Sequence, residues 1–339
     1  MFGTYRALLA ILVVVLHYVR LNFIGQYAVF GFFVLSGYLM TFIMQNNYGY
    51  SLRGIVGYAV NRFLRIYPLY WFSCAVAALI LLILGPLHTT RLNGFYAFPE
   101  TSMGWMRNIF LFLEFNGPTT FIGPAWALTV ELFFYLCIGL GLSRSGKTTL
   151  AWFVLSVAYT GYMVVTGADF VQRYATLGAA SLPFATGALI YHWRDELKVR
   201  LPLLFTAGYA PAALFCLLLL NHAVMLLAGL AGSYGFYSNY MICALLVISL
   251  IGRKALPFIP HKLDNALGEL SYPMYLIHYP LGFLFLYIYR YAGLEFTAPG
   301  PVAFLLFFPP LLVVSWAMAA GIERRVETLR TAVKTRLKA

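Results

Sequence analysis

Long apolar segments separated by short polar joints recur along the whole chain. A helix needs about 17–25 predominantly apolar residues to cross a hydrocarbon core of about 30 Å. The pattern therefore predicts an all-α, polytopic transmembrane bundle of about ten spans. We place these spans at 7–24, 27–44, 66–85, 125–142, 150–166, 175–192, 203–220, 235–251, 270–289 and 302–322.

Two stretches depart from this pattern. The apolar stretch 222–232 is too short to cross a bilayer, and we interpret it as a re-entrant or interfacial piece. The segment 86–124 is polar and glycine-rich, with an amphipathic piece at 105–115. Long loops tend to carry specificity, so we expect this segment to cap the entrance to a binding site.

The positions of the basic residues give an orientation. With the N-terminus in the cytoplasm, all but five of the 23 Lys and Arg residues fall on the cytoplasmic side. The positive-inside rule then predicts that both termini lie inside. The five exceptions are Arg20, Arg91, Arg107, Arg173 and Arg290.

The composition agrees with a membrane protein. The chain is 62% hydrophobic and only 10% charged, which leaves no room for a separate soluble domain. We expect one integral membrane domain over 1–339, ending in a basic cytoplasmic tail, 323–339, that can rest on anionic lipid. The net charge of +12 reflects topology, and no contiguous basic surface on a soluble fold indicates a nucleic-acid partner.

The four cysteines fall inside apolar runs at unrelated spacings, and no CxxC or Cys/His metal pattern occurs. We expect buried, reduced thiols and no metal site. The sequence also has no phosphate-binding glycine loop followed by lysine, no GxSxG and no HExxH.

Arg6 and His17 stand eleven residues apart in the first apolar segment. On a helix, eleven steps of about 100° come to about three turns plus 20°, so both side chains share a face. With Arg6 at one interface, His17 would lie about 16 Å deeper, near the middle of the bilayer. An ionisable group at that depth is expensive, and it indicates a functional site facing the protein interior.

Four further motifs follow in order: FFVLSGYL at 32–39, RFLRIYPLYW at 62–71, GPAWALTVE at 123–131 and LSYPMYLIH at 270–278. Together with the Arg6 and His17 pair, these motifs resemble the acyltransferase-3 family of integral membrane acyltransferases. The resemblance spans residues 6–278.

The resemblance implies transfer of an acyl group, usually acetyl, from acetyl-CoA to a hydroxyl that is commonly on a sugar. Family members O-acetylate bacterial surface polysaccharides, peptidoglycan and Nod factors, or acylate macrolide sugars. We therefore expect a multi-pass protein of the bacterial inner membrane, with acyl-CoA as donor substrate and no tightly bound cofactor. The acceptor would be a carbohydrate or glycoconjugate, reached under the cap 86–124. Many members carry a C-terminal soluble hydrolase-like domain, which we do not expect here.

Acyl transfer to a hydroxyl needs a base and stabilisation of an oxyanion. We predict His17 as the base, since a histidine stays neutral near pH 7, and Glu131 as the carboxylate that orients it. Arg20, one turn further along the same helix face, could hold anionic groups or steady the oxyanion. The structural alternatives are a packing histidine, an inter-helix hydrogen bond at Glu131 and a snorkelling arginine.

Arg62 and Arg65 lie three residues apart at the inner interface and so share a helix face. Guanidinium groups suit bidentate phosphate contacts, and CoA presents its phosphates on the cytoplasmic side. We predict that Arg6, Arg62 and Arg65 bind acyl-CoA; ordinary positive-inside anchoring is the alternative.

Besides Arg20, four residues are candidates for the acceptor or acyl pocket. In the ninth span, Tyr275 and His278 share a face, and Pro273 is tolerable because we place it near the helix start. Tyr135 lies one turn from Glu131, and Ser36 is a hydroxyl beside a small residue. Packing is the alternative for Ser36, and a structural histidine for His278.

Two routes stay open: His17 activates the acceptor hydroxyl directly, or it first carries the acyl group covalently. The competing class is a secondary transporter or flippase, which also keeps charges at mid-membrane. Such folds usually show internal repeats, and these motifs have no second copies. A scaffold protein would leave the clustered polar residues unexplained.

Overall fold

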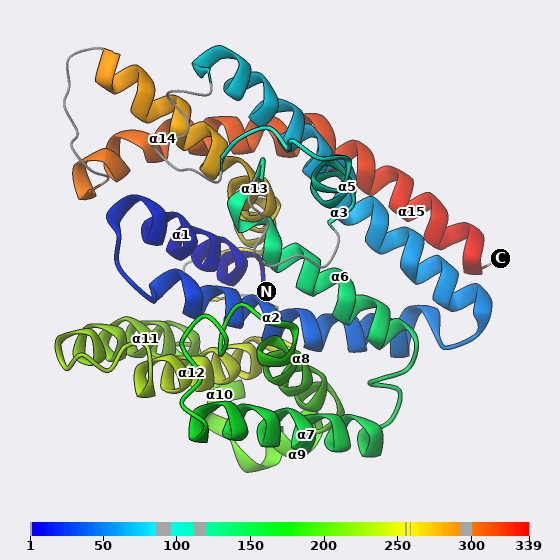
Figure 1. Cartoon of the computed structure of the whole chain (residues 1–339). Coiled ribbons are helices and arrows are strands. Elements are labelled where there is room, and N and C mark those ends of the chain that lie inside the picture. Colours follow the sequence, from blue (N-terminus) through cyan, green and yellow to red (C-terminus); the bar gives the residue numbers. More distant parts are fainter. Residues whose placement is uncertain are drawn as a thin grey trace. The chain divides into compact units, whose positions relative to one another are not determined.

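The computed structural model describes residues 2–85, 96–111, 120–254, 256–257, 259–291 and 300–338. Within these ranges the regular secondary structure is helical, and an isolated bridge joins Leu256 and Ile259. Figure 1 shows the helices in sequence colours from blue to red. The helices up to the middle of the chain are α1 (Gly3–Val19), α2 (Ile24–Ile43), α3 (Leu52–Leu84), α5 (Ser102–Phe110), α6 (Trp126–Gly139), α7 (Gly146–Val165) and α8 (Leu177–His192).

The second half of the chain continues in the same way. Its helices are α9 (Arg194–Arg200), α10 (Pro202–Thr206), α11 (Ala210–Leu227), α12 (Tyr234–Leu250), α13 (His261–Tyr291), α14 (Pro301–Met318) and α15 (Arg324–Lys338). Two π-helical turns, Met44–Tyr48 and Ala319–Glu323, extend α2 and join α14 to α15, and a 3-10 turn, Gly123–Ala125, precedes α6.

Each of the ten predicted spans overlaps a helix. Among the described residues, five helices are long and apolar enough to cross a membrane. They are Ile24–Tyr48, Leu52–Leu84, Gly146–Val165, Ala210–Leu227 and Pro301–Ala332. Three shorter apolar helices cover Gly3–Val19, Gly123–Gly139 and Tyr234–Leu250. The number of ten and the orientation stay predictions.

The segment around α11 differs from its prediction. The span predicted at 203–220 starts at Ala210, because Pro202 begins the separate short helix α10 and Pro211 stands in the first turn of α11. The stretch 222–232 is not a separate piece: its first half completes α11, and the chain then turns at Gly229, whose φ is 71°. The predicted cap is described only in part, since 86–95 and 112–119 lie outside the described residues.

The chain divides into two compact units. Unit 1 comprises Met1–Val13, Asn22–Ala59 and Val130–Gly268; unit 2 comprises Val14–Leu21, Val60–Thr129 and Glu269–Ala339. Helices α1, α3, α6 and α13 contribute residues to both.

The core of unit 1 is built on the close approach of α2 and α8. A Cβ added at Gly37 would lie 2.1 Å from the carbonyl oxygen of Phe184, and one at Gly187 would lie 2.0 Å from that of Val34. Both positions therefore need glycine, and the two backbones touch. Helix α7 then covers α8, where Trp152 donates a hydrogen bond to Ser181 over 2.8 Å.

A carboxylate at the start of α13 caps α1 within unit 1. Asp264 Oδ1 accepts hydrogen bonds from Thr4 N and Thr4 Oγ1, both at 2.8 Å, and Oδ2 accepts from Gly3 N at 3.1 Å. The first N–H groups of a helix have no partner within it, so this contact satisfies them. Burial raises the pKa of Asp264, which lies outside the predicted spans, but these hydrogen bonds outweigh burial and hold the pKa below its usual value.

In unit 2, aromatic side chains of α3 hold the end of α5. Tyr67 Oη donates to the carbonyl of Phe110 over 2.8 Å, and Trp71 Nε1 donates to that of Ile109 over 2.9 Å. Tyr70 Oη donates to Asn108 in the same way. The last carbonyls of a helix lack intrahelical donors, so these contacts explain why the motif at 62–71 is rich in Tyr and Trp.

Candidate active site

His17 lies near the end of α1 with its ring against α13, within unit 2. Its Nδ1 is 3.2 Å from Nε2 of His278, and the two ring centroids are 5.2 Å apart. The edge of Tyr279 meets the His17 ring at 5.9 Å with an interplanar angle of 80°. His17 is half-buried whereas His278 is fully buried. The structure thus brings together two of the predicted site residues.

The neighbouring turns of α13 are fixed from both sides. His278 Nδ1 is 3.1 Å from the carbonyl oxygen of Met274, and Tyr275 Oη donates to the carbonyl oxygen of Pro124 over 2.5 Å. A Cβ at Gly123 would lie 2.8 Å from the Tyr279 ring. The 3-10 turn before α6 therefore packs directly on the α13 face that carries the predicted pocket residues.

Two predictions about local geometry are wrong. Helix α1 ends at Val19, and Arg20 follows in the left-handed region with a φ of 58°, exposed to the surroundings. Because the helical register stops there, Arg20 does not continue the His17 face. Pro273 does not stand near a helix start either, since α13 begins at His261. It removes the hydrogen bond that the carbonyl of Glu269 would otherwise receive.

Ser36, Glu131 and Tyr135 form a hydrogen-bonded cluster in unit 1. Ser36 Oγ donates to Glu131 Oε1 over 2.9 Å, and Tyr135 Oη donates to Oε2 over 3.0 Å. Ser36 Oγ and Tyr135 Oη are 3.5 Å apart. Ser36 and Tyr135 are buried and Glu131 is partly so, and two hydroxyl donors stabilise a carboxylate in such surroundings.

Arg6 belongs to unit 1, at the start of α1. A Cβ at Gly268 would lie 2.7 Å from Nη2 of Arg6, so the absence of a side chain there makes room for the guanidinium. Arg6 also interacts electrostatically with Asp264 and Tyr135. The positive group thus lies within electrostatic range of the cluster that holds Glu131.

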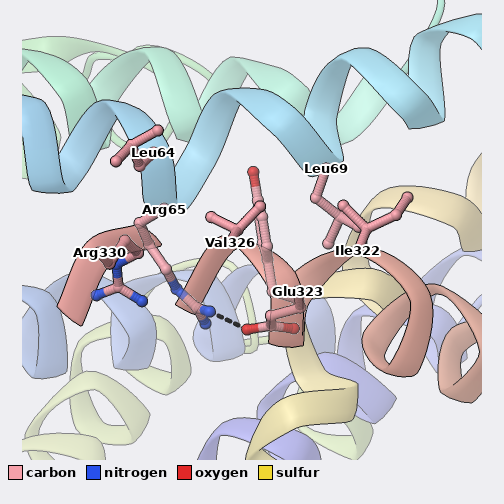
Figure 2. Close-up of a pocket in the computed structure, with 8 residues that line it drawn as sticks. Leu64, Arg65, Leu69, Ile322, Glu323, Val326 and Arg330 are labelled. Atoms are coloured by element: carbon pink, nitrogen blue, oxygen red, sulfur yellow. Dashed lines mark hydrogen bonds and ion pairs between the residues drawn. The ribbon is translucent and has the colours of Figure 1, made fainter. Parts of the chain in front are cut away.

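Arg65 and Arg62 lie on α3 in unit 2. Arg65 forms an ion pair with Glu323, the last residue of the π-helical turn before α15, and its guanidinium lies 5.5 Å from the ring centroid of Tyr272. Figure 2 shows this pair in a small pocket between α3 and α15. The cavity measures about 10 Å³, which is roughly one water molecule. The pocket is lined by Leu64, Arg65, Leu69, Tyr272, Ile322, Glu323, Val326 and Arg330.

Asn61 joins Arg62 to α15. Its Oδ1 accepts from Arg62 Nη2 at 2.5 Å and from Arg330 Nη2 at 3.1 Å. Two guanidinium groups therefore converge on one neutral acceptor, and Arg330 also forms an ion pair with Glu327. Arg65 and Arg330 are thus both paired with carboxylates of the C-terminal segment.

Eight of the ten predicted residues therefore fall into three groups: His17 with His278 and Tyr275; Ser36 with Glu131 and Tyr135; and Arg62 with Arg65. Arg6 and Arg20 belong to none of these groups. Sequence reasoning missed Tyr279, Asn61, Glu323 and Asp264. Glu323 carried a signal, since it is an acid directly after the last predicted span. Among the described residues, no group of three or more His, Cys, Asp or Glu side chains could hold a metal ion.

These helices define the class of the protein. The described part of the chain is all-helical with membrane-spanning helices, so this is an integral membrane protein. The chain belongs to the acyltransferase-3 family: residues 4–320 match the model of that family, which is described as an acyltransferase domain. It is therefore a membrane acyltransferase. No curated protein and no solved structure matches the chain.

Proposed function

We propose that this protein is an acyl-CoA-dependent O-acyltransferase of the bacterial inner membrane. It moves an acyl group, in the first instance acetyl, from cytoplasmic acyl-CoA to a hydroxyl of a carbohydrate or glycoconjugate of the cell envelope. His17 acts as the base or as the acyl carrier, supported by Glu131. The observation that carries the proposal is the half-buried His17 ring, fixed by His278 and Tyr279 in a helix that is otherwise apolar from Ala7 to Leu16.

In the direct route, His17 takes the proton of the acceptor hydroxyl while that oxygen attacks the thioester carbonyl. The tetrahedral intermediate then expels the CoA thiolate, which takes the proton back from His17. In the covalent route, His17 itself attacks the thioester and later gives the acyl group to the acceptor oxygen. Both routes end with one ester formed and one thioester broken.

Arg6, Arg62 and Arg65 bind the phosphates of the donor in this proposal. The meeting of Arg62 and Arg330 at Asn61 supports it, because neighbouring guanidinium groups suit an anionic ligand. At Arg330 such a ligand competes with Glu327, which forms an ion pair with that side chain. Arg65 is already paired with Glu323, so a donor phosphate must replace that carboxylate. The small cavity in Figure 2 holds no more than the end of such a group.

Glu131 supplies the fixed negative charge of the proposed site. Ser36 and Tyr135 donate hydrogen bonds to it, and in this proposal its negative charge stabilises a protonated His17. Tyr275, His278, Ser36 and Tyr135 border the acyl or acceptor pocket in this proposal. Arg20, exposed beyond the end of α1, is placed to meet an anionic group of the acceptor.

The test uses sealed membrane vesicles of both orientations, given acetyl-labelled acetyl-CoA and a glycan acceptor on each side. Acetyl-CoA does not cross a bilayer, so inside-out vesicles should release CoA and label the glycan fraction, whereas right-side-out vesicles should not. His17→Gln should abolish the signal, and His261→Gln, at an exposed histidine at the start of α13, serves as the matched control. Equal labelling by wild type and His17→Gln would remove His17 from the chemistry. An absence of labelling in every vesicle would favour a transporter.

A further inference from the structure

The ring nitrogens of His17 and His278 form a directional chain of contacts within unit 2. The chain begins at the carbonyl oxygen of Met274, which lies 3.1 Å from Nδ1 of His278. It continues from Nε2 of His278 to Nδ1 of His17 over 3.2 Å. Each of these two contacts involves one ring nitrogen of His278, and the second also involves Nδ1 of His17.

The direction of these bonds follows from the carbonyl at one end. A carbonyl oxygen only accepts, so His278 Nδ1 carries the hydrogen. An imidazolium at His278 would be costly, because this side chain is fully buried and its Nδ1 faces a neutral carbonyl. A neutral His278 with its hydrogen on Nδ1 has a lone pair on Nε2, which then accepts from Nδ1 of His17. Neutral His17 consequently keeps its own lone pair on Nε2.

We propose that His278 is a positioning residue that holds neutral His17 in the Nδ1–H tautomer, so that Nε2 of His17 is the nitrogen that reacts. This inference rests on the proposed function, in which His17 serves the acyl transfer. The orienting role that we predicted for Glu131 is thereby assigned to His278, whose imidazole lies next to Nδ1 of His17.

The arrangement also favours proton uptake. When His17 gains a proton on Nε2, its Nδ1–H bond to His278 becomes charge-assisted and therefore stronger. His278 itself stays neutral, so the resting site buries no charge at this pair. The Tyr279 ring packs against both imidazoles and limits their rotation. Its centroid lies 5.9 Å from that of His17 and 6.5 Å from that of His278.

The direct test reads the tautomer without any turnover. In protein labelled with ¹⁵N-histidine and placed in lipid nanodiscs, NMR distinguishes a protonated ring nitrogen from one with a lone pair. Wild type should show His17 with Nδ1 protonated and Nε2 bare, the signal being assigned by its loss in His17→Gln. A His17 signal with the hydrogen on Nε2 would overturn the proposal, whether or not the protein transfers acyl groups.

The kinetic test uses two variants of the same residue. His278→Phe keeps a ring but has no acceptor, so kcat should fall about 100-fold with the KM for acetyl-CoA little changed. In His278→Gln the amide oxygen can accept from His17 Nδ1, so most of the rate should return and the tautomer should persist. A purely structural role predicts that both variants lose stability together. Equal losses of kcat and equal melting temperatures in the two would therefore contradict positioning.

The two failures are distinguishable. If wild type transfers no acyl group but shows the Nδ1–H tautomer, the proposed function fails and the geometric inference stands. If wild type transfers acyl groups through His17 while the tautomer is mixed or reversed, the function stands and His278 loses its role.

Discussion

Two polar clusters within apolar helices invite comparison. In unit 1, both oxygens of Glu131 accept hydrogen bonds, from Ser36 and Tyr135, so the hydrogen bonds end on the carboxylate. In unit 2, the contacts run from the carbonyl of Met274 through His278 to Nδ1 of His17, which in our proposal places the lone pair of His17 on Nε2. The first arrangement holds a charge in place, whereas the second prepares a group to take a proton. Similar polar content therefore supports different chemical roles.

The largest expected effect comes from breaking the imidazole pair. His17→Gln should lower kcat about 10³-fold or more, because the base or nucleophile is removed. The double variant with His17→Gln and His278→Phe should have the same kcat as His17→Gln alone, because His278 acts only through His17. The measurement is steady-state transfer from acetyl-CoA by the three purified variants. Additive losses would show that His278 has an independent task.

The next largest effect concerns the contact between α2 and α8, beside Ser36 of the carboxylate cluster. Gly37→Ala should destabilise the protein by about 2 kcal/mol, because a Cβ there meets the backbone of α8. Gly161→Ala in α7, where a Cβ meets nothing within 4 Å, is the matched control and should be neutral or stabilising. Thermal unfolding in detergent compares the two. A melting temperature for Gly37→Ala no lower than that of the control would refute the close contact of α2 and α8.

Glu131→Gln sharpens the comparison directly. It removes the charge but keeps the size of the side chain, so kcat should fall about tenfold, less than in His17→Gln. Ser36→Ala, which removes one of the two donors, should have a smaller effect in the same assay. If Glu131→Gln proved more damaging than His17→Gln, the carboxylate would be the base and the roles of the two clusters would be exchanged.

The capping carboxylate of α1, the helix that carries both Arg6 and His17, predicts a dependence of stability on pH. Asp264→Asn should lower the free energy of unfolding by about 1 kcal/mol at neutral pH. Because the pKa of Asp264 lies below its usual value, its contribution is complete above about pH 4 and is lost as the pH falls through the lowered pKa. Melting curves of wild type and Asp264→Asn should therefore converge in acid. A constant difference down to the lowest pH would contradict the cap.

The smallest effect concerns the ion pair of Arg65 with Glu323, at the acyl-CoA site that we propose in unit 2. Glu323→Gln should lower the KM for acetyl-CoA about threefold, because it leaves Arg65 with its charge for a donor phosphate. Glu196→Gln removes an exposed acid of α9, far along the chain from this cluster, and controls for net charge. A raised KM in Glu323→Gln alone would mean that the ion pair shapes the binding site instead of competing with the donor.

The sequence predicts the helices better than their ends or their pairings. Apolar length is a local property, and every predicted span overlaps a helix. Helix ends depend on turn geometry, which explains why Arg20 and the true start of α13 were misjudged. The motifs singled out His17, His278, Ser36 and Glu131, but the contacts join residues 261 and 95 positions apart. Such pairings follow from tertiary packing and leave no signal in spacing.

The central claim is that acyl transfer depends on His17, as the base or as the acyl carrier. The most direct measurement follows label from acetyl-CoA to a glycan acceptor with purified wild type, His17→Gln and His278→Gln in nanodiscs. Wild type should release CoA and label the glycan in equal amounts, His278→Gln should keep most of that rate, and His17→Gln should lose it while remaining folded. Equal transfer by wild type and folded His17→Gln would contradict the account.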